Sequence, residues 1–216
     1  MRFLSYMMVF LFGVVIDATD YQSLVKEVKW TDIIAALATV VTAIIVYMTY
    51  SRWLDSKKRE DAYQTSKNYI SCLVDISELL DETMSPFEQC VPQAGGIPIK
   101  CEQSNSLLAN SNDALYKLMA KAKTLARTKS ELSFWEVTLV PEFEKNHERI
   151  LQEVSDVFVV AGALQSQVYW YYNVDQSKQD SMFDEFSKLK ARVINAKKLL
   201  DLRYSRKYAD FFVHEK

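Results

Sequence analysis

The pattern of apolar and polar positions divides the chain near residue 53. Residues 33–50 carry no charged side chain. Extending this run to Trp53 gives a helix that can cross a hydrocarbon core of roughly 30 Å. Further along, apolar residues recur every three or four positions, which predicts amphipathic helices packed around a shared core. The first such stripe consists of Ala62, Tyr69, Leu73, Ile76 and Leu80.

Aromatic and basic residues flank the apolar run as expected at the two surfaces of a membrane. Tyrosine and tryptophan rings prefer the headgroup levels, and basic residues stay on the cytoplasmic side. Acidic residues dominate the approach to the run, whereas a basic cluster follows it. We therefore predict that the chain after Arg52 is cytoplasmic, at the cell membrane, which would be the inner membrane in a bacterium. The predicted membrane-interface residues are Trp30, Tyr47, Tyr50, Arg52, Trp53, Lys57, Lys58 and Arg59.

Residues 1–18 form another apolar segment that has two interpretations. Arg2 precedes an apolar stretch long enough for a signal peptide, with cleavage near Ala18. Alternatively, the segment is retained as a short or tilted first span, so that the two apolar segments form a hairpin. The hairpin is favoured, because Asp17 does not suit a cleavage site. Both interpretations place the large domain on the same side of the membrane.

Small residues recur on one side of the predicted span. Ala35, Thr39 and Ala43 are spaced four residues apart and therefore share a helix face. Small side chains let helix backbones approach closely in lipid, where apolar burial gives no drive to associate. We interpret these residues as a helix-association face, whose partner is the first apolar segment or another copy of the chain.

The expected fold class is all-α. Glycine and proline are scarce, with four of each, which favours long helices over the many turns of a sheet. We expect an N-terminal apolar segment and external loop in residues 1–31 and a transmembrane helix in residues 32–53. Residues 54–216 would then form an antiparallel cytoplasmic bundle of about four long helices, with an irregular loop at 85–104.

Several helix boundaries can be predicted within this bundle. The membrane helix should continue into the domain and end at Ser85 and Pro86. A later helix should begin at Pro141, since proline suits the first helical position. The segment 128–140 is expected to be a short helix or a bent connector, and the last helix to run from about Gln176 to Tyr208.

The helix after Pro141 has the strongest apolar pattern in the chain and should be the most buried one. Its middle is apolar nearly all round, and a run of aromatic residues follows. Since consecutive side chains on a helix point in different directions, at least one of these rings should be exposed. We identify Tyr169, Trp170 and Tyr172 as a candidate partner patch. The expected core face consists of Phe143, Ile150, Val154, Val157, Phe158, Ala161, Leu164, Val168 and Tyr171.

Composition and motifs argue against several other functions. A net charge of -2 gives no general reason to expect nucleic acid as a partner. Cys90 and Cys101 bracket the irregular loop and could close a disulfide only in an oxidising compartment. Glu144 and His147 have the Glu-x-x-His spacing of di-iron bundles, but such a site needs the motif twice. We therefore expect no enzyme activity, no metal or other cofactor and no small-molecule substrate, and interpret His147 as a hydrogen-bonded core or boundary histidine.

The sequence thus predicts a membrane-anchored helical bundle that acts as a non-catalytic interaction or scaffold module at the cytoplasmic membrane face. Its expected partners are the lipid bilayer and either another protein or a second copy of itself. The alternative is a membrane-acting effector or exclusion protein, whose apolar helices assemble in the bilayer.

Overall fold

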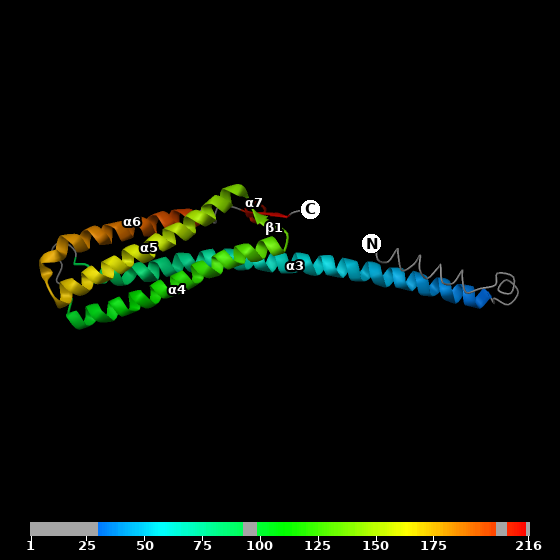
Figure 1. Ribbon diagram of the computed structural model, residues 1–216, viewed down its shortest axis with the longest axis horizontal. Helices are drawn as coiled ribbons and strands as arrows, with labels where there is room; N and C mark the ends of the chain where they lie inside the picture. Colours follow the sequence, from blue (N-terminus) through cyan, green and yellow to red (C-terminus); the bar gives the residue numbers. More distant parts are fainter. Residues whose placement is uncertain (1–29, 93–98, 202–206, 215–216) are drawn as a thin grey trace, which may run out of the picture. The chain divides into compact units, whose positions relative to one another are not determined.

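The computed structural model describes residues 30–92, 99–201 and 207–214. These residues are predominantly helical, which confirms the expected helical class. The long helices are α3 (Trp30–Cys90), α4 (Cys101–Phe134), α5 (Pro141–Asn173) and α6 (Gln179–Asp201), and the short ones are η1 (Gln176–Lys178) and α7 (Tyr208–Phe211). Two short strands, β1 (Val137–Leu139) and β2 (Phe212–His214), complete the order (Figure 1). The predicted segment 1–31 lies almost entirely outside the described residues.

The chain divides into two compact units, Met1–Ser56 and Lys57–Lys216. Helix α3 contributes to both, since its first part belongs to the first unit and its remainder to the second. No other described element lies in the first unit. The second unit contains the rest of α3 and all the elements that follow it.

Helix α3 does not end where the sequence analysis placed its end. It continues through Pro86 to Cys90, so the predicted stop at Ser85 and Pro86 is wrong. Proline removes one helical hydrogen bond, but here that bond lies in the last turns of the helix. Phe87 and Cys90 are both fully buried, and burying them favours the extra turn. The irregular loop is correspondingly shorter, because α4 already begins at Cys101.

The long helices of the second unit share one apolar core. Helix α5 packs against α4 and α6, and its predicted core face is buried except for Phe158, which is half-buried. Val159 is 67% exposed, so α5 also has a solvent-facing side, and its apolar middle is not enclosed all round. Pro141 is the first residue of α5, as predicted. The largest fully buried side chains include Ile76, Leu80, Phe87, Leu115, Leu118, Leu125, Leu164, Leu189 and Leu200.

A small antiparallel sheet was not predicted. Strand β1 pairs with β2 in the register Val137 to His214, Thr138 to Val213 and Leu139 to Phe212. The sheet lies next to aromatic side chains, with the rings of Phe143 and Phe211 4.1 Å apart between centroids. The predicted single helix from Gln176 to Tyr208 is wrong: η1 occupies Gln176–Lys178, α6 is described as far as Asp201, and Lys207 precedes the separate helix α7 and strand β2. The sheet ties the last described residues to the segment between α4 and α5.

Ion pairs connect neighbouring helices of the second unit. Lys121 on α4 meets Asp75 on α3 at 2.7 Å, and Lys129 on α4 meets Glu144 on α5 at 2.8 Å. Such partly exposed pairs contribute only about 0–1 kcal/mol each. Their value lies in fixing which helix faces meet, while the apolar core supplies most of the stability.

The turn between α4 and β1 contains a residue in an unusual backbone conformation. Glu136 has a φ of 59°, in the left-handed region where a Cβ costs about 1 kcal/mol. Its backbone N–H donates to the carbonyl of Ser133 at 3.2 Å, and that of Trp135 donates to Leu132 at 3.0 Å. This is the position after a helix where glycine is usually preferred.

Replacing Glu136 by glycine is therefore expected to stabilise the second unit. The free energy of unfolding should rise by about 0.5–1 kcal/mol, because glycine relieves the left-handed strain. The urea midpoint measures this change. A matched control is Glu148→Gly, an exposed position inside α5, where glycine should instead destabilise by about 1 kcal/mol. Equal destabilisation in both variants would contradict the role given to the turn.

Candidate functional site

The first part of α3 is a candidate membrane segment. It belongs to the one helix in the described residues that is long and apolar enough to cross a bilayer, and none of its most apolar stretch is buried by protein. Exposed large side chains follow one another from Ile34 to Leu54. Water would meet all of them unless lipid or another chain covers this segment.

The hydroxyl groups in this segment are satisfied within the helix. Thr39 donates to the carbonyl of Ala35 at 2.9 Å, Thr42 to Ala38 at 2.8 Å, and Thr49 to Ile45 at 2.8 Å. A hydrocarbon environment offers no water to unpaired polar groups, so internal hydrogen bonds are what it requires. The threonines are therefore compatible with lipid contact.

The predicted interface residues lie on α3, and those with described side chains are exposed. The rings of Tyr50 and Trp53 have centroids 6.0 Å apart, and Tyr47 is exposed one turn earlier. Arg52 is exposed. The side chain of Trp30 lies outside the described residues. The tyrosine and tryptophan rings near the end of the apolar run are thus free to lie at a headgroup level.

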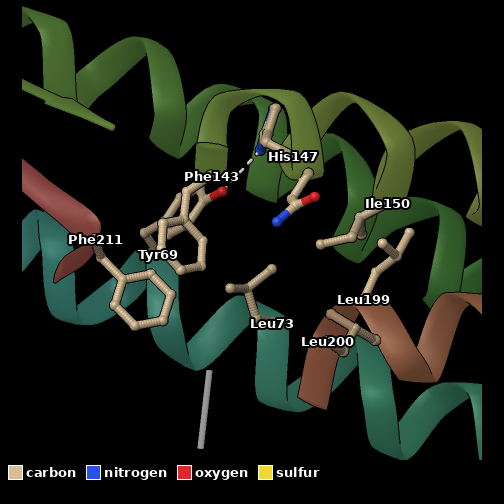
Figure 2. A pocket seen from close by; sticks show the side chains of 9 residues that line it. Tyr69, Leu73, Phe143, His147, Ile150, Leu199, Leu200 and Phe211 are labelled. Carbon is tan, nitrogen blue, oxygen red and sulfur yellow. Dashed lines mark hydrogen bonds between the residues drawn. The ribbon is translucent and has the colours of Figure 1, made fainter. Parts of the chain in front are cut away.

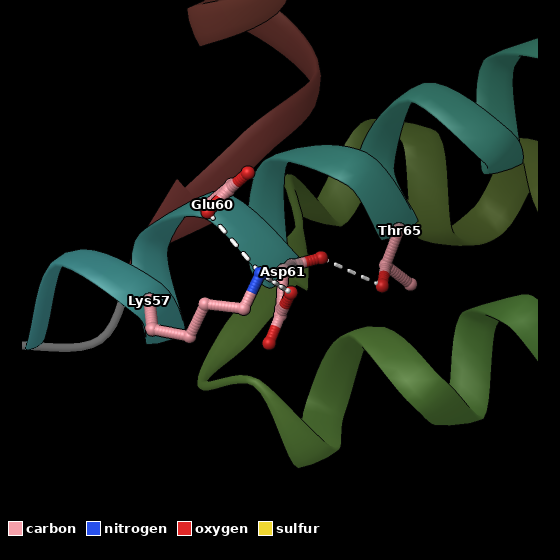
Figure 3. Close-up of polar contacts among 4 residues, drawn as sticks. All are labelled: Lys57, Glu60, Asp61 and Thr65. Atoms are coloured by element: carbon pink, nitrogen blue, oxygen red, sulfur yellow. Dashed lines mark hydrogen bonds and ion pairs between the residues drawn. The ribbon is translucent and has the colours of Figure 1, made fainter. Parts of the chain in front are cut away.

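The three basic residues that begin the second unit differ in their contacts. Lys58 and Arg59 are exposed. Figure 3 shows Lys57 reaching the carboxylates of Glu60 and Asp61, each at 3.2 Å. Hydrogen bonds to Asp61 and Glu60 raise the pKa of Lys57. Lys57 is therefore held by its own helix, whereas the other two can face an anionic surface.

The predicted helix-association residues Ala35, Thr39 and Ala43 are all exposed on α3. Their shared face carries no large side chain at these positions, and the hydroxyl of Thr39 is directed to its own backbone. A second helix could approach this face closely. No described residue covers it.

The aromatic patch at the end of α5 divides into exposed and anchoring residues. Tyr169 and Trp170 are 51% and 47% exposed. Tyr172 is half-buried, and its hydroxyl donates to the carbonyl of Cys90 at 2.8 Å. Tyr172 therefore holds the end of α3 against α5, while much of the surface of Tyr169 and Trp170 is exposed.

A buried polar pair lies between α3 and α5. The hydroxyl of Tyr69 and Nδ1 of His147 are 3.0 Å apart, although the two residues are separated by 78 positions in the sequence. Both side chains are almost fully buried. The predicted role of His147 as a hydrogen-bonded core histidine is confirmed. Its partner could not have been identified, because nothing in the local spacing relates the two residues.

Figure 2 shows this pair beside a small cavity lined mainly by apolar side chains. The cavity volume is about 10 Å³, which is about the least space that holds one water molecule. Burial lowers the pKa of His147 to about 4, with a smaller contribution from the charge of Lys129, while Glu144 opposes the change. Burial also raises the pKa of Tyr69. Both groups are therefore neutral near pH 7.

The cysteines do not form a disulfide in the structure. Cys72 and Cys90 are buried, Cys101 is exposed, and all three are free thiols. Burial raises the pKa of the Cys90 thiol to about 11, so it stays protonated near neutral pH and is a poor nucleophile. Cys101 lies 3.0 Å from the side-chain oxygen of Asn173 at the end of α5.

No family model, curated protein or solved structure matches this chain. Among the residues that the structure describes, no three His, Cys, Asp or Glu side chains are placed to hold a metal ion. The candidate sites are the apolar segment of α3 and the exposed rings Tyr169 and Trp170 on α5.

Proposed function

We propose that this chain is a membrane-anchored, non-catalytic interaction or scaffold protein. In this proposal the apolar part of α3 crosses the bilayer, and the helices of the second unit form an antiparallel bundle at the cytoplasmic face. The observation that carries the proposal is the apolar stretch of α3, which is long enough to span and has none of its surface covered by protein. Burying so much exposed apolar surface in lipid is strongly favourable.

The mechanism would be positional. Anchoring confines the second unit to a thin layer at the membrane surface, which raises its effective concentration toward other membrane-bound molecules. Tyr169 and Trp170 are suited to contact a partner, because large rings bury much area and lose little side-chain entropy. Catalysis is not needed for such a role.

Site-specific photo-cross-linking in intact membranes tests this proposal. A photoreactive amino acid at Trp170 should give a discrete adduct with a partner or with a second copy, whereas the same group at Tyr116 should not. Tyr116 is a more exposed ring than Trp170, at 63% against 47%, and lies on α4 outside the candidate patch. A reporter fused after Lys216 should be active only in the cytoplasm. An external reporter signal would contradict the topology, and identical adducts at both positions would contradict the patch.

The second candidate is an effector or exclusion protein whose apolar helices assemble in the bilayer. It is favoured by the exposed small residues Ala35, Thr39 and Ala43, which lie on one face of the candidate span. Here the second unit would sense a trigger, and the assembled helices would perturb or block the membrane.

Substituting leucine at Ala35, Thr39 and Ala43 is expected to separate the two functions. Bulky side chains would keep helix backbones apart, so assembly should fall by about tenfold or more if the small face is the contact. Chemical cross-linking in membranes, with a reagent that does not react with cysteine, measures the fraction of the chain that is dimeric. A control with leucine at Ala36, Val40 and Ile44 places leucines at the same spacing on another exposed face, which is already mostly lined by large side chains. An unchanged dimer fraction in the first variant would favour the simple anchor.

A further inference from the structure

The side of α5 that faces solvent carries no charged residue over its last turns. Within residues 152–173 the charged side chains are Glu153 and Asp156, and both pair with Arg192 on α6. The outward positions of this stretch recur every three or four residues and therefore share one face of the helix. All of them are exposed except one, which is half-buried. This α5 face consists of Gln152, Ser155, Val159, Gly162 (the half-buried one), Ala163, Ser166, Tyr169, Trp170 and Asn173.

The α5 face has the composition of an interface between proteins. The exposed sides of α4 and α6 carry charges, such as those of Lys117 and Lys188. The α5 face instead presents Val159, which is 67% exposed, and the rings of Tyr169 and Trp170, which are about half exposed. Loss of charged residues together with enrichment in tyrosine and tryptophan is typical of the centre of an interface.

Polar groups on the α5 face already have partners within the chain. The hydroxyl of Ser166 donates to the carbonyl of Gly162 at 3.2 Å. The side-chain amide of Asn173 donates to the carbonyl of Tyr169 at 2.9 Å. A donor that keeps its hydrogen bond can lose contact with water at little cost. The face can therefore be covered without leaving these donors unpaired.

Gly162 lies in the middle of the α5 face, where the fold gives no reason for a glycine. Glycine is less favourable than alanine inside a helix. Beyond its own turn of helix backbone, a Cβ at this position would meet no atom of the described residues within 4 Å. A second helix that crossed here from outside would need the glycine, because the missing Cβ lets two backbones approach closely.

We propose that two copies of this chain pack through their α5 faces, with the two α5 helices crossing near Gly162. This rests on the proposed function and names a second copy as the partner. Two copies anchored in one membrane have the same orientation, so their two-fold axis would follow the membrane normal and the α5 helices would run parallel. Residues near such an axis meet their own counterparts, and a charge there would face a like charge. The absence of charge makes the α5 face complementary to itself.

The size of the α5 face also suits anchored copies. Its 22 residues span about 33 Å, and a helix is about 10 Å wide with its side chains. The face therefore covers roughly 300 Å² of flat area, less than the about 800 Å² that each partner buries in a standard interface. Copies held in one membrane associate through a smaller area, because anchoring raises their effective concentration toward each other.

Disulfide trapping in membranes tests this packing. The full chain is placed in phosphatidylcholine vesicles with Cys101→Ser, which removes the exposed thiol and keeps the two buried cysteines. After oxidation by copper phenanthroline and oxygen, Ser166→Cys should give at least about fivefold more disulfide-linked dimer than Ser71→Cys. Ser71 is an exposed serine on α3 and controls for random collisions. Non-reducing electrophoresis measures the dimer, and equal yields from the two positions would overturn the proposal.

A bulky residue at the crossing point provides the second measurement. Gly162→Leu should lower the dimer yield of the Ser166→Cys chain by about fivefold or more, because its side chain would keep the helices apart. The midpoint of thermal unfolding should not fall, since the new Cβ enters open space and leucine favours a helix. Asn68→Leu adds a leucine at an exposed position of α3 and should leave the dimer yield within about twofold. An unchanged yield in Gly162→Leu would overturn the crossing.

The two levels of inference can fail separately. If Trp170 cross-links to a different protein while Ser166→Cys gives no more dimer than Ser71→Cys, the α5 face binds that protein. The proposed interaction function would then stand, and the pairing of two copies would be wrong. Absence of both products would remove the proposed function together with this inference.

Discussion

A chain without residues 1–18 that carries Val41→Arg and Ile44→Arg is expected to lose its membrane association, because neither apolar segment can then anchor it. Both side chains are about half exposed and make no contribution to the buried core, so the substitutions leave the second unit intact. Each arginine near the middle of a span adds about 2.5–3.5 kcal/mol to the cost of insertion. The variant should move from the carbonate-resistant membrane pellet to the supernatant, as measured by immunoblotting.

The matched control introduces the same charges elsewhere. Tyr116→Arg and Ile194→Arg alter exposed apolar positions on α4 and α6, and this double variant should stay in the pellet. If the variant with arginines in α3 also remained resistant to carbonate, the apolar segment would not be the anchor. Soluble expression of the unaltered chain would lead to the same conclusion.

Acidification is expected to destabilise the second unit through His147. Its pKa is about 4 in the folded chain and about 6.5 when exposed. Between these values the unfolded chain binds more protons than the folded one, so stability is fully present above pH 6.5 and falls as the pH is lowered toward 4. The loss from this group should reach about 3 kcal/mol. Urea unfolding followed by circular dichroism at several pH values measures it.

Two variants isolate this contribution from the titration of carboxylates. Tyr69→Phe with His147→Leu removes both members of the buried hydrogen bond, which avoids leaving one of them unpaired. In the unaltered chain, His147 lowers the free energy of unfolding as the pH falls from 6.5 to 4. This part of the decrease should be absent in the double variant. The chain has only one other histidine, and His214→Gln should leave the decline in place. If the free energy of unfolding depended on pH in the same way in the unaltered chain, the double variant and His214→Gln, His147 would not be the group that causes the loss of stability.

Long helices were predictable because their apolar spacing extends over many turns. The core face of α5 repeats from Phe143 to Tyr171, and its buried positions agree with that repeat. The first residue of α5 was also predictable, because Pro141 suits only a few positions in a helix. Such local signals do not require knowledge of distant parts of the chain.

The errors in the fold arise where distant residues decide the local structure. Pro86 signals a helix end, but burial of Phe87 and Cys90 against other helices carries α3 further. Strands β1 and β2 have three residues each, too few for an alternating pattern to be recognised. Their pairing joins segments that are more than seventy positions apart.

The candidate sites were predictable to different extents. The span and its exposed rings follow from composition, because lipid contact selects residue types along a continuous segment. The pairing of Tyr69 with His147 depends on which helix faces meet. Single-helix periodicity states which face is apolar but not which neighbour covers it.

The pairing of β2 with β1 has a consequence for genetics. A nonsense codon at Phe211 would leave α3, α4, α5 and α6 encoded. It would nevertheless delete a strand, the ring that packs on Phe143 and the ring that packs edge-on against Tyr69. Late truncating alleles should therefore behave as loss-of-function alleles through degradation of the unfolded product, even with every long helix still encoded.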